Sequence, residues 1–354
     1  MKFLRLAFYV LIAQLVLSGC AGEAVEETSS SSSSEINFDA YLGRNASTRS
    51  EVTDNTHLKG TEGNSGFGVF ARYNYNGKIL SLLDTEHVTW NKDQNHWEYT
   101  NTRFWPSEGS VDFYAFAPYS TAPKLESPNK NEANPTCIYF PSNLSPIDLV
   151  WANAMERTKT NEPVKFTFNH ALARLGLDIK ANQKLEKNGA VITVNKVILY
   201  GASETSGVFV MAGYLNLENG AWTLADNGIS WFYTWTPDGK VDGNEEVKKN
   251  GTVLKLSASQ LNDTTNIITN DANSYIFIIP QKKDEPFHLK ITYTVQQGDF
   301  VEEVTVKKNL LDVLRPGDPN PSFTFERGKA YVFHLKLSLD PINFYVTPKV
   351  EDWK

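Results

Sequence analysis

The sequence predicts an all-β protein built from two β-sandwich domains, and three observations support this prediction. The chain has 354 residues, which is enough for about two domains of ~150 residues each. Hydrophobic residues make up 41% and charged residues 21%, a balance that is typical of folded chains and excludes disorder for most of the length. Short runs of alternating apolar and polar residues recur throughout, without a long apolar stripe at helical spacing. Many short strands separated by turns are typical of sandwiches.

Residues 1–19 are predicted to be a signal peptide. Lys2 and Arg5 give a positive start, and residues 6–17 form an apolar run that is too short to span a bilayer. The run ends in Leu-Ser-Gly-Cys20, which resembles the bacterial lipobox. In signals of that kind the Cys thiol carries acyl chains such as palmitate and becomes the first residue of the mature chain. The alternative is an ordinary cleaved signal with a cysteine there by chance.

Residues 20–35 are predicted to be a flexible tether. The segment is acidic, rich in serine and free of aromatic side chains, so it cannot bury enough apolar surface to fold. The other of the two cysteines, Cys137, is then left alone and is interpreted as a small buried hydrophobe.

The N-terminal sandwich is predicted over residues 36–162. Its central strand is 111–117, which is apolar on both faces apart from Asp112 and which ends at Pro118. Residues 118–146 are rich in Pro, Asn and Ser and are predicted to be loops around one short strand. That short strand is expected at 137–140, and the other strands are expected at 36–42, 66–73, 85–90 and 96–100.

The C-terminal sandwich is predicted over residues 163–354. The polar, Pro-containing stretch 158–163 is interpreted as the boundary. Strands are expected at 164–168, 172–180, 191–200, 207–217, 274–280, 287–296, 300–307 and 329–339.

No motif in the sequence argues for catalysis, a cofactor or a metal site. The sequence contains none of the motifs HExxH, P-loop, GxGxxG or GxSxG. The six histidines are scattered, and His170, between two apolar strands, is interpreted as structural. The acidic stretch 238–245 has Lys240 where a calcium loop needs a ligand, so a surface turn is expected. The net charge of −7 argues against a nucleic-acid partner.

Tryptophan usage leaves one binding function open. The chain has eight tryptophans, and Trp222, Trp231 and Trp235 lie close together in the sequence. Exposed rings of this kind could stack on sugars, although filling a core is their commoner role. A surface glycan-binding lipoprotein of a polysaccharide-uptake system is therefore the alternative function.

Several short motifs in a fixed order resemble the fimbrillins of the Bacteroides–Porphyromonas group, Mfa-like and FimA-like lipoproteins that build or anchor surface fimbriae. Each motif is weak by itself, and their order over nearly the whole chain carries the resemblance. They are Cys20, the strand 36–42, Thr48-Arg49-Ser50, Phe67-Gly68-Val69-Phe70-Ala71, the run 111–119, Asp148-Leu149-Val150-Trp151-Ala152, the run 166–175, Gly328-Lys329-Ala330-Tyr331 and Val350-Glu351-Asp352-Trp353. Acidic residues behind Cys20 also resemble the surface-export signal of lipoproteins in that group.

The resemblance implies two tandem transthyretin-like β-sandwiches and a function in assembly, with no enzymatic activity and no cofactor. The implied partners are other fimbrillin subunits in a head-to-tail polymer, the outer membrane through the N-terminal lipid, and a surface ligand on host or bacterial cells. The implied location is the cell surface, as an outer-membrane lipoprotein and part of a fimbrium.

The resemblance also implies proteolytic removal of a placeholder strand near the N-terminus. A trypsin-like protease is expected to cut after Arg49, or else after Arg44, in a stretch of small and polar residues. The strand that would be released, 36–42, places Ile36, Phe38 and Ala40 on one face that can fill a groove. A permanent edge strand is the alternative.

The C-terminal segment 342–354 is expected to be the donor strand that fills a neighbour's groove. Ile342, Phe344 and Val346 share one face after Pro341, and Val350 and Trp353 are expected to be terminal anchors. The alternative is a final edge strand of the chain's own second domain.

Overall fold

The computed structural model describes residues 34–42, 55–60, 66–119, 123–129, 132–140, 148–181, 189–225, 230–240, 251–256, 260–261, 266–267, 276–337 and 345–353. The predicted signal peptide, the predicted tether up to residue 33, Arg44, Arg49, Ile342 and Phe344 lie outside the described residues, and Cys20 with them. The last two residues of the predicted tether are paired with the chain at 104–105: Trp105 N donates to Ser34 O at 2.7 Å, and Glu35 forms a β-bridge with Phe104.

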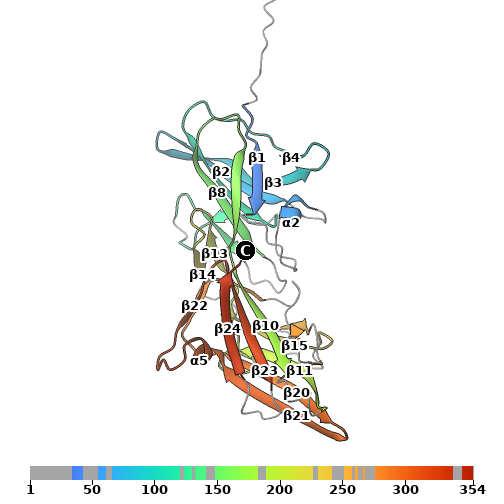
Figure 1. Ribbon diagram of the computed structural model, residues 1–354. Coiled ribbons are helices and arrows are strands. Elements are labelled where there is room, and N and C mark those ends of the chain that lie inside the picture. The colour runs from blue at the N-terminus through green and yellow to red at the C-terminus, as the bar shows by residue number, and fades with distance from the viewer. Residues whose placement is uncertain are drawn as a thin grey trace, which may run out of the picture.

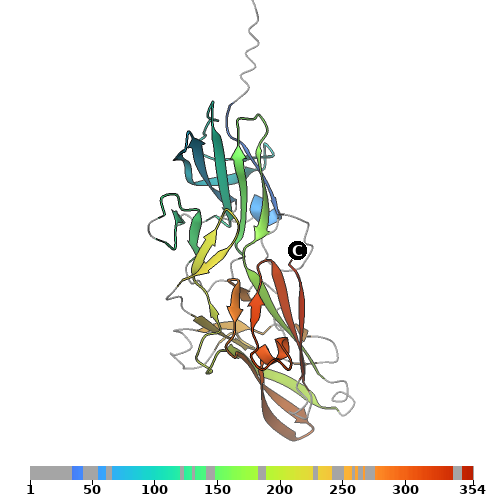
Figure 2. The same cartoon turned by 90° about the vertical axis from the view of Figure 1, so that its left-hand side faces the viewer.

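The molecule is elongated, with one β-rich body above another in both views (Figure 1, Figure 2). Its described part holds two helices, α2 (Asn55–Lys59) and α5 (Leu310–Leu314), and otherwise strands and turns. No described helix has the length and apolar character needed to cross a membrane. The all-β class predicted from the sequence is confirmed.

The upper body is a seven-stranded sheet. β5 (Ser110–Ala117) lies in its middle with β2 (Phe67–Tyr75) and β8 (Val150–Arg157) antiparallel on either side, so the predicted central strand is found. The order across the sheet is β1 (Phe38–Leu42), β9 (Val164–His170), β8, β5, β2, β3 (Lys78–Asn91) and β4 (His96–Glu98).

The lower body has two larger sheets that enclose one hydrophobic core. Its strands alternate buried and half-exposed residues, as in β20 (His288–Gln297) and β23 (Lys329–Leu337), which is what a sheet with one face on a core requires. One sheet runs β17 (Asn266–Ile267), β10 (Ala173–Ala181), β23 (Lys329–Leu337) and β24 (Tyr345–Asp352), with β18 (Ile276–Ile278) also on β10. The other runs β12 (Phe209–Val210), β15 (Ser230–Thr236), β11 (Val191–Tyr200), β20 (His288–Gln297) and β21 (Phe300–Asn309), with β16 (Gly251–Lys255) on β15.

Two small sheets lie where the bodies meet. The first runs β14 (Trp222–Leu224), β13 (Gly213–Asn216), β7 (Cys137–Phe140) and β6 (Leu125–Glu126), so it pairs strands from both halves of the sequence. The second consists of β19 (Gln281–Lys283) and β22 (Phe323–Phe325). A separate hydrophobic cluster, which we call the joint cluster, fills this region: Phe70, Tyr114, Phe116, Ile138, Leu149, Trp151, Ala171, Leu172, Leu215, Leu217, Phe277, Ile279, Ala330 and Trp353.

The chain leaves the upper sheet later than the sequence indicated. The stretch 158–163, interpreted as a boundary, is the loop between the antiparallel strands β8 and β9. β9 lies in the upper sheet because Phe166 and Phe168 belong to the core of that body. The crossing to the lower body comes at Ala171 and Leu172, which are both buried in the joint cluster. The division into two folding units stays a prediction.

Candidate assembly edges and the joint between the bodies

The N-terminal strand β1 forms one edge of the upper sheet. It pairs with β9 in parallel, with Phe38 opposite Val164 and Leu42 opposite Phe168. Bonds outside the ladder hold the chain before and after it: Ile36 N donates to Arg103 O at 2.8 Å, and Leu42 N donates to Asn55 Oδ1 at 2.7 Å. The strand is therefore fixed along its whole length.

The side chains of this strand alternate strictly between core and solvent. Ile36, Phe38, Ala40 and Leu42 are buried, whereas Tyr41 is 49% exposed. Four aromatic rings surround Phe38, with centroids 5.3 to 6.4 Å away: Tyr99, Phe166, Phe113 and Phe67. The face predicted from Ile36, Phe38 and Ala40 thus fills the centre of the upper core.

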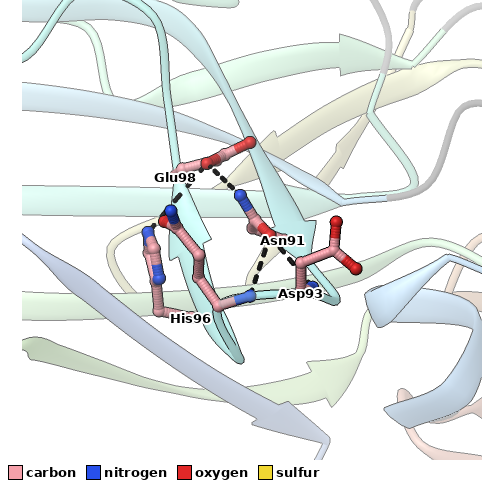
Figure 3. A network of polar contacts seen from close by, with 5 residues as sticks. Asn91, Asp93, His96 and Glu98 are labelled. Carbon is pink, nitrogen blue, oxygen red and sulfur yellow. Dashed lines mark hydrogen bonds and ion pairs between the residues drawn. The ribbon is translucent and has the colours of Figure 1, made fainter.

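The opposite edge of the same sheet, β4, is covered by polar groups. Asn91 donates to Glu98 Oε2 at 2.8 Å, and His96 Nε2 lies 3.9 Å from the same carboxylate (Figure 3). The Asn91 amide oxygen also accepts bonds from the backbone of Asp93 and Gln94 at the turn. Charged and hydrogen-bonded groups at a short edge strand discourage the addition of another strand.

The C-terminal strand β24 forms an edge of the lower body. It pairs antiparallel with β23 from Lys329–Asp352 to Lys336–Tyr345. Its side chains face mostly outward, with Tyr345 56% and Val350 49% exposed, and only Val346 packs partly on the lower core. The structure thus shows this strand paired within its own chain.

The end of β24 is anchored by Trp353, which is 6% exposed. Its ring stacks on His170 at 4.0 Å between centroids with an interplanar angle of 9°, and Phe277 lies 5.4 Å away. His170 Nδ1 is 2.9 Å from the buried carboxylate of Asp148. A residue from the C-terminus therefore packs on the last residue of an upper-body strand.

Comparison with known proteins identifies the family of this chain. The fimbrillin-like family matches residues 48–353. The chain belongs to the fimbrillin-like family. It is 26% identical over 383 residues to the fimbrium subunit Fim1C of Phocaeicola vulgatus, covering 97% of this chain and 95% of that protein. A crystal structure of a fimbrial protein from Bacteroides vulgatus superposes with a TM-score of 0.61 at 20% identity, covering 90% of this chain and 99% of that chain.

The predicted site residues of this fimbrillin lie in separate places. Ile36, Phe38 and Ala40 are in the upper core, whereas Val346 and Val350 lie on the edge of the lower body. Trp353, predicted as an anchor for a neighbour, packs at the joint of its own chain. The prediction of His170 as a structural residue agrees with its bond to Asp148 and its stacking on Trp353.

The sequence features that suggested glycan or metal binding fall only partly within the described residues. Trp235 is fully buried and Trp222 is half-buried, so these two rings do not form an exposed sugar platform together, and the side chain of Trp231 lies outside the described residues. Asp238 accepts a bond from the backbone of Lys240 within a turn. No group of three metal-ligating side chains occurs in the described residues.

Sequence reasoning missed the residues that join the two bodies. Trp222 Nε1 donates to Ala171 O at 2.7 Å, Gly328 N donates to Leu172 O at 2.9 Å, and Asn153 Nδ2 donates to Leu217 O at 3.1 Å. These partners are far apart in the chain, so local alternation carries no signal of them. The stretch 166–175, through which the chain crosses, contains no Pro or Gly, and the boundary was expected earlier, at 158–163.

Proposed function

We propose that this fimbrillin is a non-enzymatic subunit of a surface fimbrium, and that it assembles by exchange of an edge strand. The observation that carries the proposal is β1, an edge strand whose alternate side chains fill the upper core. A strand held in this way can be replaced by a strand of the same pattern from a neighbouring subunit. We also propose that each body is a transthyretin-like sandwich. The facing sheets of the lower body, which share one core, support this for that body.

Removal of β1 would leave a deep apolar groove. Each large apolar side chain transferred from core to water costs about 1.5–3 kcal/mol, and Ile36, Phe38 and Leu42 are all buried. The backbone of β9 would also lose its ladder partners along residues 164–168. An edge with unpaired backbone groups and an apolar groove is a template for a new strand.

The events at the N-terminus that precede exchange are part of the proposal. Cys20 would carry the lipid that holds the subunit at the outer membrane until cleavage after Arg49, or after Arg44, releases β1. Both arginines follow β1 and precede α2 in the sequence, so a cut at either one separates β1 from the rest of the chain. The released subunit would then join a polymer at the cell surface.

The C-terminal segment is proposed as the donor. In its own chain β24 exposes most of its side chains and pairs with another strand on one side only. Its release therefore uncovers little apolar surface apart from Val346 and Trp353. Ile342, Phe344 and Val346 would supply the alternate apolar residues that the groove vacated by Ile36, Phe38 and Ala40 accepts.

A reversible lock on β1 tests the exchange. Tyr41 and Thr167 lie opposite each other in the β1–β9 register, and both are exposed, so cysteines at both positions can be crosslinked without disturbing the core. After proteolysis at Arg49 the reduced double variant should form polymers and the oxidised one should remain monomeric, as seen by electron microscopy and size-exclusion chromatography. The single variants Tyr41→Cys and Thr167→Cys control for each substitution. Equal polymerisation of the oxidised and reduced forms would refute strand exchange at this edge.

A further inference from the structure

A groove of about 550 Å³ opens at the joint, beside the edge strand β14 and the strand pair β19–β22. β13, β14 and β22 follow one another down one side of the molecule (Figure 1). The residues that line the groove include Asn219, Trp222, Lys282, Thr324, Glu326 and Arg327. A volume of this size is ordinary for small-molecule sites, which range over about 300–1,000 Å³.

Neighbouring groups fix the position of the Arg327 guanidinium in this groove. It lies over the ring of Trp151 with 5.0 Å between its carbon and the ring centroid, and it donates to Asn219 O at 2.9 Å. Gly220, with φ +70°, makes the turn that leaves room for it, because a Cβ at that position would overlap both Trp151 and Arg327. The guanidinium is therefore oriented before any ligand arrives.

The charge of Arg327 is not neutralised within the described part of the chain. Burial lowers the pKa of its guanidinium, and no carboxylate offsets that effect. Glu326 also lines the groove, but its charge acts on Lys329 and Tyr331, whose pKa values it raises. Lys282 is exposed and pairs only with the exposed Asp284 at 3.3 Å. A partly desolvated cation without an anion favours an anionic partner.

The other side chains in the groove suit a sugar. Trp222 is fixed by its bond to Ala171 O and by an edge contact with Phe140 at 6.0 Å between centroids. The Oδ1 atom of Asn219 accepts from Ala221 N, which leaves its Nδ2 donor without a partner in the described residues, and Thr324 adds an exposed hydroxyl. An indole ring packs on the apolar C–H face of a pyranose, while amide and hydroxyl groups bind its hydroxyls.

We propose that this groove binds an acidic saccharide, with its carboxylate on Arg327 and a ring face on Trp222. A peptide fits less well, because β14 and β22 each have three residues and can offer few ladder hydrogen bonds. The site is separate from β1 and β24, so it does not depend on strand exchange.

The test uses a matched pair of probes on the full chain: 3′-sialyllactose, which carries a carboxylate, and lactose, which does not. Isothermal titration calorimetry should show binding of the acidic trisaccharide and at least about tenfold weaker binding of lactose. Arg327→Gln should remove that difference, and Thr324→Val should weaken both probes by a smaller factor. Lys308→Gln removes one positive charge from the exposed face of β21 and should change neither affinity.

Three results would overturn the proposal: equal affinity for the two probes, unchanged binding by a folded Arg327→Gln variant, or tighter binding of a peptide with a free C-terminal carboxylate than of the trisaccharide. If Arg327→Gln lowers the melting temperature, two other measurements decide whether the groove binds the trisaccharide: the NMR resonance of Trp222 Nε1–H and the affinity of the Thr324→Val variant. That resonance must shift on addition of the trisaccharide to the unaltered chain. Polymer formation should be unaffected by Thr324→Val, so failure here and failure of strand exchange are distinguishable.

Discussion

The two edge strands at the ends of the described chain are held by opposite means. β1 has five residues, and its inward side chains lie among the aromatic rings of the upper core. β24 has eight residues, most of them exposed, and the buried side chain of Trp353 follows directly after its last residue. The shorter strand is therefore held by its side chains and the longer one by its backbone ladder and Trp353.

This difference indicates which edge costs more to open. A backbone hydrogen bond lost to water costs little net free energy, about 0.5–1.5 kcal/mol, because water replaces the partner. An apolar side chain finds no such replacement. Opening β1 therefore costs much free energy, and an incoming strand is needed to offset that cost. β24 can leave once Trp353 is released.

The largest effect is expected from Phe38→Ala in β1. The side chain contacts four rings, so the substitution should lower the free energy of unfolding by about 3–5 kcal/mol. Tyr41→Ala on the exposed face of the same strand is the control and should cost less than about 1 kcal/mol. Urea unfolding measures both. Similar losses for the two variants would mean that β1 is not held by its buried face.

A smaller effect is expected from Trp353→Ala, directly after β24. The stacking on His170 and Phe277 would be lost, but the site lies at the end of an edge strand and can partly collapse, so we expect about 2–3 kcal/mol. Trp353→Phe keeps a ring on His170 and should recover more than half of the loss. A Trp353→Ala variant as stable as the unaltered chain would show that the ladder alone holds β24.

The pH dependence of stability should distinguish the edges further. Burial raises the pKa of Asp178, which lies on β10 next to β23 in the same sheet, while His334 at 2.6 Å, Lys180 and Lys349 of β24 oppose the shift. The folded protein thus holds this proton more tightly than the unfolded chain. The free energy of unfolding falls as pH rises from the ordinary value of 3.8 through the raised pKa.

Asp178→Asn should remove this part of the pH dependence in urea titrations between about pH 4 and 7. Asp39→Asn, which removes one carboxylate from the exposed face of β1, is the matched control for the loss of a charge, and this variant should keep the fall attributed to Asp178. A profile that keeps its slope in Asp178→Asn would contradict the assignment of the proton to this carboxyl.

The sequence predicted the edges better than it predicted the joint. The alternation of Ile36, Phe38 and Ala40 specifies which face is buried because side chains in a strand repeat every two residues. The pairing of β7 with β13 and the packing of Trp353 on His170 join residues far apart in the chain. Such contacts have no local pattern, and a polar stretch such as 158–163 is equally compatible with a linker and with a hairpin loop.

The smallest effect is expected at Cys137, which can report on which edge communicates with the joint. Burial raises the pKa of its thiol to about 11, and because the thiolate is the reactive form, alkylation near pH 8 should be slow until the joint opens. Its neighbour Ile138 shares the joint cluster with Trp353, whereas Phe38 belongs to the core of the upper body. The experiment uses a Cys20→Ser background and conditions under which every variant is folded. Trp353→Ala should then speed the alkylation of Cys137 by iodoacetamide severalfold. Phe38→Ala should change this rate less. Mass spectrometry of the alkylated chain over time gives the rates. Equal acceleration by the two substitutions would show that both edges are coupled to the joint, and the contrast between β1 and β24 would then be one of local packing alone.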